Sequence, residues 1–301
     1  MTSCNVDQII RAKPMAEGAG VVVHRTIGTQ SLRNLDPFLM LDHFGSDNPN
    51  EYIAGFPDHP HRGFITLTYM LDGHMLHEDS MGNRGDLSAG GVQWMKAASG
   101  VIHSEMPQQT DGLMRGFQLW INLPAKQKMS EPGYQEFSAA AIPTLEITGG
   151  TVKIICGRIA EIEGPIKDSN TDVFYYDLCI NPHQVMNITT DSSHQMFAYC
   201  YDGSAEVQES QGQGSEGQGA GKPAPVPTHS LVTFTRGDSL SIAGGSEGAN
   251  LILVGGKPIN EEIVQYGPFV MNTPAEIETA IADFHAGKLV QKKAAFVTDS
   301  A

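Results

Sequence analysis

The chain has 301 residues, enough for about two domains that each bury a substantial core. Its 33 glycines and 17 prolines are typical of many short strands joined by tight turns. The formal net charge of −15 at pH 7 repels phosphate backbones and anionic lipid surfaces, so we expect no direct binding to nucleic acid or to a membrane.

Neither a secretory leader nor a membrane span is predicted. Residues 1–18 lack an apolar core segment, and no apolar run approaches the roughly 20 residues that cross a bilayer. The cysteines, Cys4, Cys156, Cys179 and Cys200, match no zinc or redox spacing. We therefore expect reduced thiols in an intracellular, cytoplasmic protein, with the nucleus as the alternative in a eukaryote. Cys4 is expected to be exposed and the other three to lie in strands.

The first half of the chain is predicted to form a series of strands. Apolar or β-branched runs cover 21–23, 38–41, 64–71, 92–96 and 117–123, with turn residues between them. The Asp72-Gly73 pair after the third run predicts a hairpin turn. His74 and His77 follow, three residues apart, so they point to opposite faces of an extended strand. We expect both to be exterior polar residues.

Two pairs of metal-binding side chains stand out among these strands. His59 and His61 form one pair, and His103 and Glu105 form the other; glycines flank both. Residues i and i+2 of a strand point the same way, so each pair projects to one face. A lone histidine on a strand is more often a hydrogen-bonded core residue, but two such pairs favour a metal site. Three imidazoles and one carboxylate suit one iron(II), and also match manganese, nickel or copper.

The second half of the chain predicts another series of strands. They cover 142–147, 152–156, 171–180, 195–201, 231–235, 238–242 and 250–254. An Asp-Gly pair follows the strand at 195–201, as it follows the strand at 64–71, which indicates a weak internal repeat. This copy offers only His194 in place of paired ligands, so we expect it to be metal-free and structural. Residues 208–228, rich in Gly, Gln, Ser and Pro, predict a flexible insertion.

A short helix is predicted near the C-terminus. Thr273 and Glu276 have the spacing of a capping box, and Pro274 takes the first helical position. Apolar residues from Ile277 onward recur at helical spacing, and Gly287 is placed to end the helix. We expect the apolar face of this helix to pack on a barrel.

The chain resembles the pirin family, whose members are two-barrel cupins. The segments that carry the resemblance are 36–45, 55–64, 91–96, 100–106, 118–123 and 266–273, spread over almost the whole chain. The resemblance implies an all-β fold of two cupin (jelly-roll) β-barrels packed together, with a short C-terminal helix. We expect a metal-binding barrel at 1–137 and a metal-free barrel at 138–301, which holds the insertion at about 208–228.

The resemblance also implies the ligand set. In pirins the four metal ligands fall on His59, His61, His103 and Glu105 of this sequence. Many cupins and pirins carry an acidic residue where this chain has Ile65. Because the pirin carboxylate comes from the later pair, the metal site is expected to survive, with the loss of a contact around it.

Four residues are expected to line a substrate pocket: His43, Phe56, Trp94 and Gln118. His43 stands apart from the other histidines, which favours a structural or pocket-wall role over ligation. Phe56 lies in the ligand stretch itself, and the position of Trp94 lies close to the metal pocket in pirins. Gln118 is the polar residue of its strand that we expect to face inward.

The resemblance further implies a function. Several pirins are similar in ligand set and pocket to flavonol 2,3-dioxygenases, which open quercetin with dioxygen. This implies an iron enzyme that acts on a small planar aromatic substrate and dioxygen, with Glu105 as the base that takes a substrate proton. We expect the chain to be a monomer.

Two other functions remain open. Animal pirins resemble iron-dependent transcription cofactors, so a non-enzymatic redox sensor that binds a regulatory protein is the alternative. An open barrel mouth that admits a planar aromatic ligand distinguishes the enzyme from it. A scaffold with an inert metal fits poorly, because structural metal sites are usually closed by four ligands in tetrahedral geometry.

Overall fold

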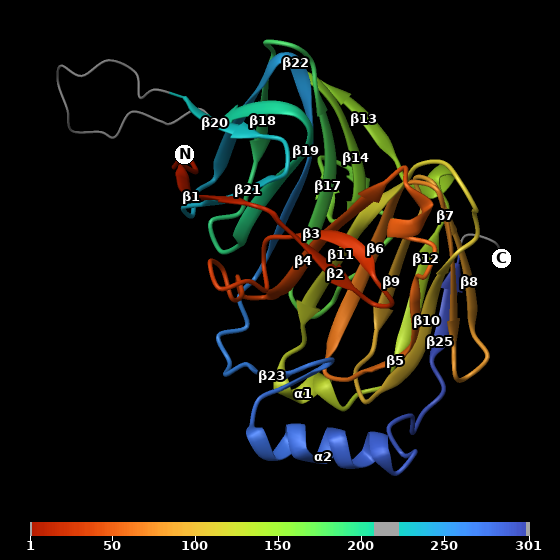
Figure 1. Ribbon diagram of the computed structural model, residues 1–301. Coiled ribbons are helices and arrows are strands. Elements are labelled where there is room, and N and C mark those ends of the chain that lie inside the picture. Colours follow the sequence, from red (N-terminus) through yellow and green to blue (C-terminus); the bar gives the residue numbers. More distant parts are fainter. Residues whose placement is uncertain (1, 208–222, 299–301) are drawn as a thin grey trace. The chain divides into compact units, whose positions relative to one another are not determined.

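The computed structural model describes residues 2–207 and 223–298, which divide into two compact units (Figure 1). The histidine unit comprises residues 13–141 and 259–298, and the second unit comprises the described parts of 2–12 and 142–258. The two ends of the chain are therefore exchanged between the units. The expected division placed one boundary between residues 137 and 138 and assigned each half of the chain to one unit. It missed this exchange, because the exchange depends on which strands pair.

The histidine unit contains an eight-stranded and a four-stranded sheet. In spatial order the eight strands are β2 (Lys13–Glu17), β3 (Val21–Arg25), β4 (Phe38–Ser46), β11 (Met114–Asn122), β6 (Phe64–Asp72), β9 (Val92–Lys96), β12 (Gly133–Phe137) and β25 (Ala295–Thr298). The four strands are β5 (Phe56–His61), β10 (Val101–Pro107), β7 (His74–Asp79) and β8 (Arg84–Ser88). Neighbours pair antiparallel except β12 and β25, which are parallel.

Smaller elements complete the histidine unit. They are the hairpin β23 (Val264–Tyr266) and β24 (Phe269–Met271), the 3-10 turns η1 (Pro49–Glu51) and η2 (Ala139–Ala141), and the helices α1 (Ala125–Lys128) and α2 (Pro274–His285). The predicted capping box of α2 is confirmed, and Gly287 has a left-handed φ of 67° just beyond the helix. Ile277 packs in one buried cluster with Phe269 and Leu289. Within the described ranges, no helix is long and apolar enough to cross a membrane.

Two buried cations fasten the C-terminal segment to the rest of the histidine unit. Arg62, directly after the His59–His61 pair, donates to the Ser99 carbonyl and pairs with Asp283 of α2 at 2.8 Å. Lys128 of α1 donates to the Val270 carbonyl of β24 at 3.0 Å, and burial lowers the pKa of Lys128 to about 8. The exchanged C-terminal segment thereby helps to hold the strand that carries the histidine pair.

The second unit is built on one nine-stranded sheet. Its main path is β1 (Val6–Arg11), β21 (Ser230–Phe234), β19 (Gln195–Val207), β22 (Ser239–Gly256), β17 (Phe174–Ile180), β14 (Gly150–Cys156) and β13 (Thr144–Ile147). Off this path, β18 (Val185–Thr189) pairs with β22 and β20 (Ala224–Pro227) with β19, while β15 (Arg158–Ile159) and β16 (Ile162–Glu163) pair with each other.

Two expectations for this unit need correction. Cys4 was expected to be exposed but is buried, with an exposed fraction of 1%. Its amide donates to the Ser239 carbonyl, and its side chain joins the apolar core. Most of the insertion expected at 208–228 lies outside the described residues, but Ala224–Pro227 forms strand β20. Cys156, Cys179 and Cys200 lie in strands, as predicted.

The Asp-Gly pairs mark corners rather than hairpin turns. β6 ends at Asp72 and pairs with β9 and β11, whereas β7 begins after Gly73 and pairs with β8 and β10. The chain therefore passes from one sheet to the other here, with Gly73 at a φ of 91°. β19 likewise continues through Asp202 and Gly203, pairing with β21 before them and with β20 after them. In both places the Asp-Gly pair thus marks a bend at which the chain changes its partner strands.

Candidate metal and substrate site

The two predicted ligand pairs meet because β5 and β10 are antiparallel neighbours. His59 lies opposite His103 in the register of the two strands, and the register shifts between His103 and Glu105. Gly63, at a φ of 93°, lies against the backbone of Val270, where a side chain would clash. This close approach explains why a glycine ends the first motif.

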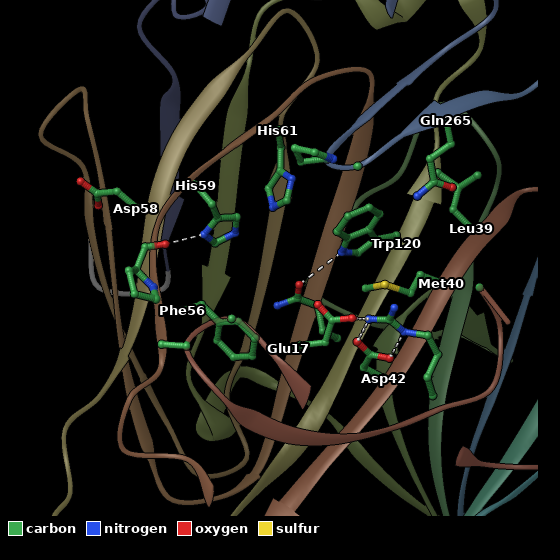
Figure 2. A pocket seen from close by; sticks show the side chains of 18 of the residues that line it. Glu17, Leu39, Met40, Asp42, Phe56, Asp58, His59, His61, Trp120 and Gln265 are labelled. Carbon is green, nitrogen blue, oxygen red and sulfur yellow. Dashed lines mark hydrogen bonds and ion pairs between the residues drawn. The ribbon is translucent and has the colours of Figure 1, made fainter. Parts of the chain in front are cut away.

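Three histidines form a compact cluster. Single ring nitrogens of His59, His61 and His103 all lie within 4.8 Å of one another. The ring centroids of His59 and His103 are 4.3 Å apart, and those of His61 and His103 are 5.0 Å apart. Figure 2 shows His59 and His61 side by side on the wall of a cavity. The i, i+2 reasoning therefore placed these imidazoles correctly.

The hydrogen bonds of these rings leave Nε2 atoms for a ligand. Nδ1 of His59 lies 2.8 Å from the Pro57 carbonyl oxygen, to which only a protonated Nδ1 can bond. The Nε2 lone pair of His59 is then available. Nε2 of His61 and of His103 is buried without a hydrogen-bond partner among the described residues. Buried ring nitrogens without a partner, on histidines that are grouped together, are what a metal site requires.

Burial keeps the buried imidazoles neutral. It lowers the pKa of His61 and of His103 well below 6.5, because a charged ring loses hydration there and neighbouring histidines add repulsion. Neutral imidazole is the form that coordinates a metal. The site therefore favours a cation held by nitrogen lone pairs over protonated histidines.

Glu105 lies at the edge of the cluster rather than in its centre. It is 2% exposed, and its carboxylate accepts hydrogen bonds from Thr68 and from Gln118 Nε2, the latter at 3.0 and 3.1 Å. The indole N–H of Trp120 donates in turn to the Gln118 oxygen at 3.2 Å, which fixes the orientation of the amide. The ligand atom of Glu105 groups with those of His103 and His77 within 4.8 Å, and not with the three-histidine cluster.

His77 is the residue that sequence reasoning misplaced. It is 2% exposed, and its Nδ1 lies 3.2 Å from Nδ1 of His103. β7 pairs with β10 so that His77 lies opposite Glu105, and Tyr134 covers its ring. Alternation correctly separated it from His74, which pairs with exposed Asp86, but which face is interior depends on sheet pairing.

The cluster opens into a cavity of about 820 Å³. Phe56 and Gln118 line it together with Met40 and Trp120, and their contact with a substrate stays a prediction. His43 and Trp94 are buried but are not among the lining residues; His43 stacks on Phe117 at 4.8 Å. Sequence position placed them near the site, but their strands direct them into the core.

Ile65 is fully buried in β6, the strand next to the site. An apolar side chain at this position packs in the core and makes no polar contact. The structure thus has an apolar core contact at the position where the family resemblance implied an acid.

Comparisons with known proteins cover most of the chain. The family model described as Pirin matches residues 20–121, and the one described as Pirin C-terminal cupin domain matches residues 175–290. A Pseudomonas aeruginosa protein provisionally named a quercetin 2,3-dioxygenase is 46% identical over 92% of this chain and 94% of its own length. A Caulobacter vibrioides pirin-like protein is 41% identical over 93% of this chain and 97% of its own length. The crystal structure of quercetin 2,3-dioxygenase from Acinetobacter baumannii has a TM-score of 0.85 at 28% identity and covers 95% of this chain and 98% of that chain.

Proposed function

Since the chain belongs to the pirin family, we propose that it is a metal-dependent dioxygenase that cleaves flavonols such as quercetin. We assign one mononuclear metal, iron(II), to His59, His61, His103 and Glu105. The observation that carries the proposal is the cluster of three imidazoles, two of which, His59 and His61, line a cavity large enough for a flavonol. The names of the similar proteins support the same reaction class.

The donor set fits a divalent transition metal. Three nitrogens and one carboxylate suit iron(II), and the same set accepts manganese, nickel or copper. A metal held by these residues would supply Lewis acidity toward a substrate hydroxyl. Of the four proposed ligands, the histidines are already grouped, and Glu105 shares a group with His103.

Glu105 is the proposed base. Its carboxylate accepts hydrogen bonds from Gln118 and Thr68, which hold its oxygens in place. A substrate hydroxyl that lies beside the histidines can donate its proton to Glu105. Gln118 cannot take that proton, so its role is to hold the carboxylate in place. The ring of Trp120, 5.2 Å from His61, offers a flat apolar wall for an aromatic substrate.

The form of the cavity favours an enzyme over a regulatory cofactor. Exposed residues such as Arg33, Asp58 and Gly267 line it together with buried His61, so it connects the cluster with the surface. A redox sensor that acts through a protein surface needs no such space beside the metal. The open mouth therefore supports a small-molecule substrate.

The test combines metal analysis with oxygen consumption. Protein purified without chelating resin is expected to contain one metal per chain and, loaded with iron(II), to consume oxygen with quercetin. His103→Ala serves as the control and is expected to lose metal and oxygen uptake together. If the iron-loaded protein consumes no oxygen with any flavonol in a panel, the dioxygenase proposal is wrong and the cofactor function gains support.

A further inference from the structure

The cavity has a charged wall that the metal chemistry does not use. Glu17, at the end of β2, Arg25 of β3 and Asp42 of β4 all line it. Arg25 donates to both oxygens of Asp42, from Nε at 2.7 Å and from Nη2 at 2.6 Å. The same Nη2 lies 2.8 Å from a Glu17 oxygen. Arg25 and Asp42 are cross-strand neighbours, so the backbone holds this network in place.

Two side chains of this network have hydrogen-bonding groups that the network does not use. The bonds of Arg25 engage Nε and Nη2, and its Nη1 has no acceptor in the described part of the chain. The Glu17 side chain is 36% exposed and uses one carboxylate oxygen for Arg25. An N–H donor and a carboxylate acceptor therefore stand next to each other on the wall of a cavity. Groups of this kind are expensive to leave unpaired when a ligand displaces water.

The network and the histidines face one space. Figure 2 shows His59 and His61 on one side of the cavity and Glu17 and Asp42 on another, with Trp120 also on its wall. Met40 adds an apolar side chain to the same lining. The cavity thus offers polar groups at two separate places with flat or apolar surface available to an aromatic body, the usual composition of a small-molecule site.

We propose that Glu17 and Arg25 form a recognition subsite for a catechol group at the end of a planar polyphenol whose other end reaches the histidines. One catechol oxygen accepts a hydrogen bond from Arg25 Nη1, and the neighbouring hydroxyl donates to Glu17. Asp42 positions the guanidinium. This inference rests on the proposed function, since it narrows the flavonols to those with two adjacent hydroxyls on the ring remote from the metal.

The test compares two flavonols that differ only in this group. Quercetin carries the catechol, and galangin is the same flavonol without those two hydroxyls. Calorimetric titration without oxygen measures binding without turnover. Glu17→Ala is expected to weaken quercetin binding about tenfold and galangin binding less than about twofold, the size of a lost hydrogen bond to a charged group. Arg25→Lys keeps a cation beside Asp42 but lacks Nη1, and should act in the same way.

The control is Asp47→Asn, which removes one negative charge at an exposed position outside the cavity lining and should change neither affinity. The inference is overturned if wild-type protein binds both flavonols equally or not at all, or if Glu17→Ala and Arg25→Lys weaken both ligands alike. If quercetin is preferred as expected but never consumed, the subsite stands and the dioxygenase proposal fails. If the protein cleaves both flavonols and binds them with equal affinity, the dioxygenase proposal is supported and the subsite proposal is wrong.

Discussion

The interiors of the two units are filled in different ways. In the second unit, buried side chains such as Val152, Leu178 and Leu251 form one large apolar cluster across the sheet. In the histidine unit, His61, His103 and Glu105 are each about as buried as the apolar core residues. The second unit buries single polar groups such as His194 and Asp177. Among the described residues, only the histidine unit brings several groups able to bind a cation together.

This difference separates stability from function. Apolar burial contributes roughly 25 cal/mol per Å², whereas a buried polar group without a partner costs about 1–3 kcal/mol. The orphan Nε2 atoms of His61 and His103 are therefore a cost that metal binding can offset. We expect the second unit to respond little to metal, pH or substrate, and the histidine unit to respond to all three.

Removal of one buried histidine from each unit tests this difference most directly. His103→Ala is expected to abolish metal binding, because His103 is the residue common to both groups of potential ligands. His194→Ala removes a buried histidine of the second unit and should retain one metal per chain. Elemental analysis of both variants decides this. A loss of metal in His194→Ala would contradict the division of roles.

Glu105→Gln tests the base without emptying the site. The amide keeps the shape and an oxygen, but cannot take a proton. We expect turnover of quercetin to fall by about 10²–10⁴-fold, the usual contribution of a general base, with substrate affinity nearly unchanged. Steady-state oxygen uptake and anaerobic titration separate the two effects. Full turnover with metal still bound would show that the base is another residue.

His77→Gln tests the residue that supports His103. The bond between the two Nδ1 atoms at 3.2 Å orients the His103 ring, and loss of such a support typically lowers metal affinity about 10–100-fold. Competition with a coloured chelator measures this affinity. His74→Gln, on the opposite face of β7, is the matched control and should have no effect. Equal metal affinity in both variants would reduce His77 to a packing role.

The metal-free protein should lose stability as the pH falls below about 6.5. Burial lowers the pKa of His61 and of His103 in the folded state, while the unfolded chain keeps the ordinary value near 6.5. Below that pH the unfolded state binds protons that the folded state does not. The free energy of unfolding then falls by at most about 1.4 kcal/mol per pH unit for each histidine. Urea unfolding at several pH values with chelator checks the sign; constant stability below pH 6.5 would contradict it.

The smallest effect is expected at Trp94. Because Trp94 is buried outside the cavity lining, Trp94→Phe should lower the melting temperature but change kcat/KM less than about twofold. Trp120→Phe is the comparison, since it removes the N–H that orients Gln118 and should lower kcat. A larger change of kcat/KM in Trp94→Phe than in Trp120→Phe would indicate that Trp94 contacts the substrate.

Much of this molecule follows from local patterns. The apolar runs predicted strands such as β4, β6 and β11, and the capping residues predicted α2. The i, i+2 spacing brought His59 and His61 to one face because strand alternation depends only on the backbone. These inferences succeeded because neighbours in the chain decide them.

Features that depend on residues far apart in the chain were decided by strand pairing. Which sheet β7 joins determines that His77 is interior, and no pattern within β7 contains that information. The same holds for residues 2–12 and 259–298, whose units depend on pairing between strands distant in the chain. By itself the sequence determined the residue types, their spacing and the local strands. The tertiary structure alone decided that Glu17, Arg25 and Asp42 share a cavity with the histidines, because only folding brings β2, β3 and β4 beside β5 and β11.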